Sequence, residues 1–196
     1  IHDYHQSFNL HNATHNGIFT YKDAVQVKYT TLALRQMPFG YMMDITIVAQ
    51  KDCHIQVLNQ HRASEALRNP EDYFFYVDNK ANPFTTTYPR YAIMTTTAQS
   101  PTGRHDLAAT SAFLFPNNKS GGVEHAIRHR EDRGVGRHTM EFDQYLKQGD
   151  TLHVAIVGNI MGSNTVPDVR NEVERLTVFQ MLEGYQRLWD RHNAAW

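Results

Sequence analysis

The stretch TLHVAIV, residues 151–157, decides the fold class, because its apolar and polar side chains alternate with a period of two. Leu152, Val154 and Ile156 would share one face of an extended strand, the pattern of a strand with one buried face. Residues 41–49, YMMDITIVA, repeat this pattern. The two segments predict a core built mainly from β-strands.

Other segments with strand character surround these two. Residues 24–29 also alternate, and the break at 37–40 predicts that they form a hairpin with residues 41–49. Further candidates are rich in aromatic and β-branched side chains, and they are residues 73–77, 85–88, 91–97, 108–115 and 138–142. About seven to nine strands separated by turn signals favour an antiparallel β-sandwich or jelly-roll-like fold. An α+β fold is the alternative.

One internal helix is predicted after Asp52, which is a typical N-cap residue. Ile55, Leu58 and Leu67 follow at a loose helical spacing. The helix would end before Pro70, because a residue that precedes proline disfavours the α region.

A C-terminal helix is predicted to begin at Asp168, which follows Pro167. Val169 and Val173 fit its first turns. Residues 176–182, LTVFQML, also have the composition of a strand, so residues 172–190 are open to either reading. The predicted organisation is a polar, His-rich N-terminal arm (1–17), a β-rich core (18–166) and a C-terminal helical segment (167–196).

Composition narrows the function classes. The chain has 196 residues, a net charge of −1 and no apolar run long enough to span a membrane, and it carries no signal-peptide pattern. Near-neutral charge argues against a dedicated nucleic-acid-binding protein. Cys53 is the single cysteine, which excludes an intramolecular disulfide and is interpreted as a structural residue.

Histidine is the one residue type in excess, with 12 copies. His2, His5, His11 and His15 in the N-terminal arm are interpreted as a weak, adventitious chelating group. The candidate metal site consists of Glu124, His125, His129 and His138, with the first two histidines on one face of a helical turn within the long polar segment 121–136. This is not the His-Glu-x-x-His pattern of metalloproteases.

Catalytic and cofactor motifs are absent from the sequence. There is no Gly-x-Ser-x-Gly elbow and no phosphate-binding loop, and Arg104-His105-Asp106 sits in a turn where adjacent side chains would diverge. No cofactor is expected, and an enzymatic role is not favoured.

Residues 34–60 resemble the strand-to-helix segment of neck and tail-completion proteins of contractile-tailed phages. The resemblance rests on residues 34–48 (LRQMPFGYMMDITIV) and 55–60 (IQVLNQ). It implies a virion component and assigns no site residues.

Three functions compete on this basis. The preferred one is a non-enzymatic virion subunit (coat, neck, tail or fibre) that binds copies of itself, and possible further partners are other virion proteins. The second is a metal-dependent enzyme or metal-binding module that uses His125, His129 and His138. The third is a carbohydrate-binding β-sandwich that uses surface aromatic residues, for which Tyr73, Phe74, Phe75, Tyr76, Tyr88 and Tyr91 are the candidates. A location in the cell or particle is predicted only for the first function, and it is the virion.

Overall fold

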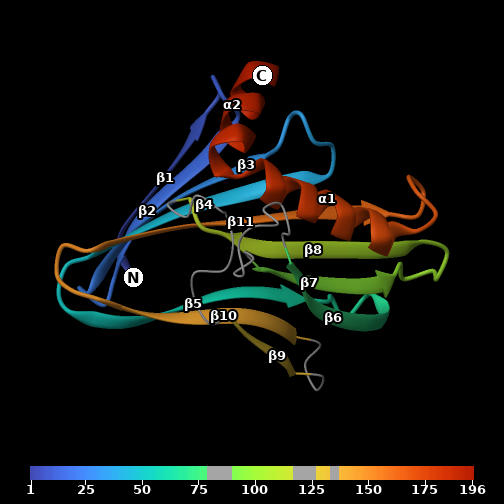
Figure 1. Ribbon diagram of the computed structural model, residues 1–196, viewed down its shortest axis with the longest axis horizontal. Coiled ribbons are helices and arrows are strands. Elements are labelled where there is room, and N and C mark those ends of the chain that lie inside the picture. The colour runs from blue at the N-terminus through green and yellow to red at the C-terminus, as the bar shows by residue number, and fades with distance from the viewer. Residues whose placement is uncertain (79–89, 117–126, 133–136) are drawn as a thin grey trace, which may run out of the picture.

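The computed structural model describes residues 1–78, 90–116, 127–132 and 137–196 and shows a mainly antiparallel β fold with two C-terminal helices (Figure 1). The strands are β1 (His2–Asn9), β2 (Thr14–Tyr21), β3 (Val25–Ala33), β4 (Gly40–Ala49), β5 (Cys53–Arg62), β6 (Arg68–Asp78), β7 (Arg90–Gln99), β8 (Asp106–Leu114), β9 (Arg128–Asp132), β10 (Arg137–Leu146) and β11 (Thr151–Gly162). The helices are α1 (Val169–Glu183) and α2 (Tyr185–Ala195). The prediction of a mainly β, sandwich-like fold is confirmed.

The strands form two sheets of unequal size. Among the described residues, the large sheet has eight strands in the order β1-β2-β3-β4-β11-β8-β7-β6, and the small sheet has three in the order β5-β10-β9. Every pair is antiparallel, and β11 joins the β1–β4 meander to the β6–β8 meander. The predicted hairpin is confirmed, because β3 pairs with β4 from Val25↔Ala49 to Ala33↔Tyr41.

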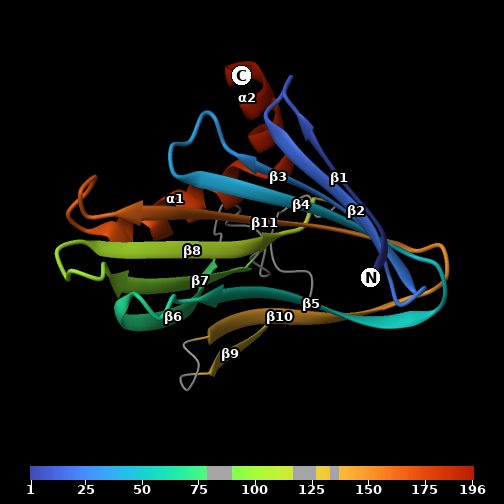
Figure 2. The same cartoon turned by 180° about the vertical axis from the view of Figure 1, so that it is seen from behind.

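The small sheet packs on one face of the large sheet, and α1 lies along the opposite face (Figures 1 and 2). Phe142 on β10 makes edge-to-face contacts with Phe113 and Phe115, at centroid distances of 5.1 and 5.4 Å. Met140 and Val154 complete this part of the core and are fully buried. Apolar burial of this kind contributes about 1.5–3 kcal/mol per large side chain.

Residues 172–190, open between helix and strand in the sequence, belong to α1 and α2, which are separated at Gly184. The predicted N-cap is confirmed, because the Asp168 carboxylate accepts a hydrogen bond from the Asn171 backbone N–H at 3.1 Å. A buried polar network also fixes the helix to the sheet: the Asn159 amide on β11 donates to Thr177 Oγ1 at 2.9 Å and to Gln180 Oε1 at 3.1 Å. These intramolecular bonds favour the helix over the strand that LTVFQML allows.

The predicted internal helix is wrong, because residues 53–62 form β5. Val57 and Asn59 point into the sandwich while Leu58 is exposed, which is the two-residue period of a strand. Asp52 caps no helix, and its carboxylate accepts the Gln148 backbone N–H at 2.8 Å. Inward-facing polar side chains hid this alternation from the sequence pattern.

Residues 1–17, predicted to be a polar arm, are hydrogen-bonded to the large sheet as β1 and the start of β2. All eight residues of β1 are exposed. Among the described residues, no helix has the length and apolar character needed to cross a bilayer.

Candidate functional site

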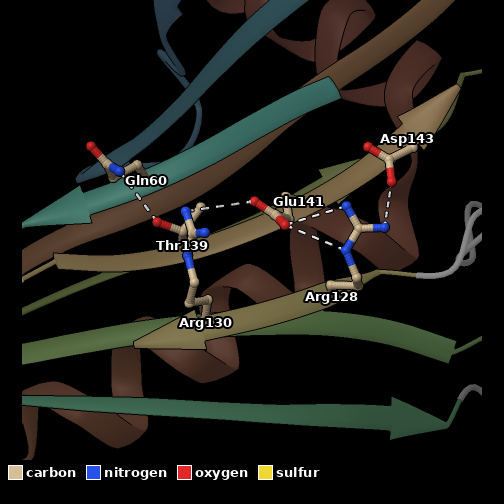
Figure 3. Close-up of polar contacts among 6 residues, drawn as sticks. All are labelled: Gln60, Arg128, Arg130, Thr139, Glu141 and Asp143. Atoms are coloured by element: carbon tan, nitrogen blue, oxygen red, sulfur yellow. Dashed lines mark hydrogen bonds and ion pairs between the residues drawn. The ribbon is translucent and has the colours of Figure 1, made fainter. Parts of the chain in front are cut away.

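The outer face of the small sheet carries a ladder of polar side chains that crosses all three strands (Figure 3). Its members are Gln60 from β5, Arg128 and Arg130 from β9, and Thr139, Glu141 and Asp143 from β10. The strand register produces the ladder, because it pairs Arg128 with Glu141 and places Thr139 between Gln60 and Arg130.

Arg128 is the centre of this ladder. Its Nε and Nη2 atoms each donate to Glu141 Oε1 at 3.3 Å, and Nη1 donates to the Asp143 carboxylate. Arg130 Nη2 lies 4.0 Å from the other Glu141 oxygen. The Glu141 side chain is only 9% exposed although it points to the outer face, so the two arginines supply the positive charge that a buried carboxylate needs.

Glu141 and Asp143 are two carboxylates side by side on the same face of β10. Their Cα atoms are about 7 Å apart, as expected for residues two positions apart on one strand, and both carboxylates bond to Arg128. A general acid in such a pair requires a raised pKa. The hydrogen bond from Arg128 instead lowers the pKa of Asp143, and Glu141 bonds to the same guanidinium. We conclude that this pair is a structural ion-pair network.

A second polar cluster lies between the two sheets. Its members are Asn59 and His61 from β5, Asp72 from β6, Thr96 from β7, Ser111 from β8, His129 from β9 and His138 from β10. Ser111 Oγ bonds to His61 Nε2 at 2.8 Å and accepts from the Asn59 amide at 2.8 Å. The other His61 nitrogen lies 3.2 Å from Thr96 Oγ1, which donates to Asp72 at 2.6 Å.

His129 and His138 meet in this cluster through their Nε2 atoms. His129 stacks on Phe74 at a centroid distance of 4.3 Å, and His138 is fully buried. The remaining nitrogen of His138, Nδ1, lies 3.4 Å from Asp72 Oδ1 but makes no hydrogen bond to any residue the structure describes. The His129–His138 pair therefore lies between the Phe74 ring and the Asp72 carboxylate.

Burial keeps these histidines neutral. Desolvation, assisted by the nearby His138, lowers the pKa of His61 to about 4. Desolvation also lowers the pKa of His129 and of His138; the charges of Glu131 and Asp72 partly offset this effect at His129, and Asp72 partly offsets it at His138. Neutral imidazoles hold hydrogen bonds inside a sandwich without the cost of a buried charge.

Only two of the four predicted metal-site residues can be placed. His129 and His138 are neighbours, whereas Glu124 and His125 lie outside the described residues. The prediction of a helical turn around His129 is wrong, because residues 128–132 form β9. The alternation of side chains along this strand points His129 inward and its two arginine neighbours outward. Within the described ranges, no three His, Cys, Asp or Glu side chains are arranged to hold a metal ion. The metal site stays a prediction.

Sequence reasoning missed His61, Asn59 and Asp72 as members of the cluster. The available signal was the inward series Val57, Asn59 and His61 at every second position of β5. A polar residue at an inward position looks like a break in the pattern unless its partners on other strands are known.

The aromatic residues proposed to bind carbohydrate are mostly occupied by the protein itself. Tyr91 is 1% exposed, and Phe74 packs on His129. Arg170 covers the Tyr73 ring at 3.4 Å from its centroid. Tyr73 lines a groove of about 680 Å³ between β6, β7 and the start of α1, where Gln99 donates to Asp106 at 3.3 Å. Tyr88 lies outside the described residues.

Comparison with known proteins gives a consistent result over the whole chain. Residues 1–196 match the profile described as glycosyl hydrolase family 65, N-terminal domain. A kojibiose hydrolase from Flavobacterium johnsoniae is 35% identical over 100% of this chain, and one from Mucilaginibacter mallensis is 33% identical over 97%. The chain spans 27% of the length of each of these relatives.

The fold has a solved counterpart. A human-microbiome protein assigned as a kojibiose phosphorylase superimposes with a TM-score of 0.64 over 98% of this chain and 24% of its own length, at 9% identity. At that identity the likeness concerns the fold alone.

These findings overturn the preferred function. The virion subunit is wrong, and so is the resemblance of residues 34–60 to phage neck proteins, which needed a helix where β5 lies. The chain belongs to glycosyl hydrolase family 65, and its residues 1–196 match the N-terminal domain of that family.

Proposed function

We propose that this chain is a non-catalytic, structural part of a longer glycoside hydrolase that cleaves kojibiose. The observation that carries the proposal is the 35% identity to a kojibiose hydrolase over all 196 residues. A second kojibiose hydrolase at 33% identity supports the same substrate. Because the chain spans only 27% of these relatives, the catalytic residues are expected in the remainder of the enzyme.

The polar groups of the domain support a structural role. Glycoside hydrolysis requires a carboxylic acid with a raised pKa beside a second carboxylate. Among the carboxyl groups that the structure describes, Asp143 and Glu172 have clearly shifted pKa values, and both are lowered because each group bonds to an arginine. These groups stay ionised at neutral pH and cannot act as the general acid.

The test uses the purified protein that carries this chain, incubated with kojibiose with and without inorganic phosphate. Hydrolysis predicts free monosaccharide at the same rate in both samples and no sugar phosphate in a chromatographic assay. Sugar phosphate formed only with phosphate would replace hydrolysis by phosphorolysis, and no cleavage would refute the substrate. Residues 1–196 alone are expected to release nothing, so cleavage by this segment would refute the non-catalytic role.

A further inference from the structure

An aromatic surface crosses the three strands at the β1 edge of the large sheet. Tyr4 and Phe19 lie 6.4 Å apart between centroids, Phe8 stacks on His15 at 4.8 Å, and Tyr29 contacts both His15 and Phe19 at 5.8 and 6.5 Å. These five rings, which we call the aromatic edge, come from β1, β2 and β3. The β1–β2 hairpin turns away from the small sheet (Figures 1 and 2).

A glycine makes room for the centre of this surface. Tyr29 lies across Gly17 on β2, and a Cβ atom at Gly17 would come within 2.2 Å of the Tyr29 ring. No side-chain shift short of displacing the ring relieves such a contact. The glycine at position 17 therefore allows Tyr29 to pack flat against the hairpin.

The apolar side chains of the aromatic edge are more exposed to solvent than is favourable for a stable edge strand. Phe8 is 75% exposed, Tyr4 is 51% exposed, and Leu10 in the adjoining turn is 84% exposed. Among the strands that the structure describes, β1 pairs with β2 alone, and none of its eight residues is buried. A strand held this way gains little from apolar burial. A covering surface would supply the missing contacts.

A groove continues the aromatic edge toward β4. It has a volume of about 510 Å³ and is lined mainly by apolar atoms of Phe8, Leu10, Ala33 and Tyr41. Contiguous exposed apolar surface of this kind marks a contact site in soluble proteins.

The end of the chain lies beside the same hairpin. His192 Nε2 is 2.8 Å from the Asn12 carbonyl oxygen in the β1–β2 turn, and Trp196 Nε1 donates to the Leu10 carbonyl at 3.3 Å. Helix α2 therefore delivers the last residue of this segment to the tip of the hairpin. A segment that continues the chain would start next to the aromatic edge.

We propose that the aromatic edge is the surface on which the remainder of the same enzyme packs. This rests on the proposed function, in which the chain is about a quarter of a longer hydrolase. Contacts between domains of one chain bury about 600–1,500 Å². A tethered domain also has a high effective concentration, which favours it over a second copy in solution.

A saccharide fits this surface less well. The polar groups among the rings already bond to one another: the Gln6 amide donates to Tyr29 Oη at 3.1 Å and to Tyr4 Oη, and the two tyrosine oxygens lie 3.2 Å apart. Sugar hydroxyls would have to break these bonds. A protein surface with apolar side chains leaves them in place.

The experiment is hydroxyl-radical footprinting of the full-length protein, with each rate normalised to the same peptide in the urea-unfolded protein. Tyr4 and Phe8 are expected to react at least about tenfold more slowly than when unfolded, because interface cores are packed like protein interiors. The internal comparison is Tyr145 on β10, which has nearly the same exposure as Tyr4, at 54%. The proposal would be overturned if Tyr4 and Phe8 reacted at rates close to those measured in the unfolded protein.

Two further results would also overturn it. Protection that disappears on dilution would identify a second copy as the occupant, and protection that appears only with kojibiose would identify a saccharide. The variant Phe8→Asp is expected to raise the labelling of Tyr4 several-fold, as a charge in an apolar interface opens it, whereas Tyr145→Asp leaves Tyr4 protected. Unchanged Tyr4 protection in Phe8→Asp counts against the proposal. Failure of the proposed function is distinct, since it appears as no cleavage of kojibiose while Tyr4 and Phe8 stay protected.

Discussion

Replacing His61 by glutamine should remove a defined part of the pH dependence of stability. The buried imidazole lies between Ser111 and Thr96, and burial lowers its pKa from 6.5 to about 4. Glutamine keeps a polar amide at this position and does not titrate. The difference between the two proteins therefore isolates one proton.

The sign follows from proton linkage. Between pH 6.5 and pH 4 the unfolded chain protonates His61 while the folded chain does not, so acid favours unfolding in this window. With these two pKa values, the wild-type chain loses about 2 kcal/mol more than His61→Gln between pH 7 and pH 5. The lowered pKa values of His129 and His138 act in the same direction in both proteins, so the difference between the two profiles reports mainly the titration of His61.

Urea denaturation of the 196-residue chain at pH 7, 6 and 5 measures the effect. The control is His54→Gln, which makes the same substitution at an exposed position of the same strand. Parallel profiles for wild type and His61→Gln would refute the reasoning, because they would mean that His61 takes up its proton without unfolding.

Four other changes have expected outcomes. Asn159→Ala should lower the free energy of unfolding by about 2 kcal/mol, measured in urea, because it leaves the buried Gln180 Oε1 without its Asn159 donor. Asp168→Ala should cost about 1 kcal/mol and Asp168→Asn much less, since asparagine also caps a helix. Phe142→Ala should cost about 3–5 kcal/mol and lower the melting temperature accordingly, and a loss below 1 kcal/mol would contradict the packing described. If the metal prediction is right, elemental analysis after dialysis finds about one equivalent of transition metal that is lost in the double variant His129→Gln/His138→Gln, and less than about a tenth of an equivalent in wild type removes it.

Sequence patterns predicted well those elements whose signal lies in neighbouring residues of the chain. The β3–β4 hairpin and β11 have clean alternation, and the N-cap of α1 follows from Asp168. β5 was missed because Asn59 and His61 face inward, and only their contacts with Ser111 show why. Pairing between residues distant in the sequence, as between β5 and β10, has no local signal.

The candidate site was harder to predict than the fold. His129 and His138 were selected for their residue type, and the structure brings them together on the paired strands β9 and β10, although a helical turn had been predicted around His129. No local sequence motif identified the family, and the carboxylates of Glu141 and Asp143 pair with Arg128 in the structure. Identity spread over the whole chain revealed the family instead.

The central place of β11 in the large sheet has a consequence for synthesis of the protein. β4 and β8 each lack a second neighbour until residues 151–162 leave the ribosome, so two strand edges stay open while most of the domain is already made. Open edges recruit other chains. Translation that stalls before residue 151 should therefore yield an aggregation-prone nascent chain, and completion of β11 closes both edges at once.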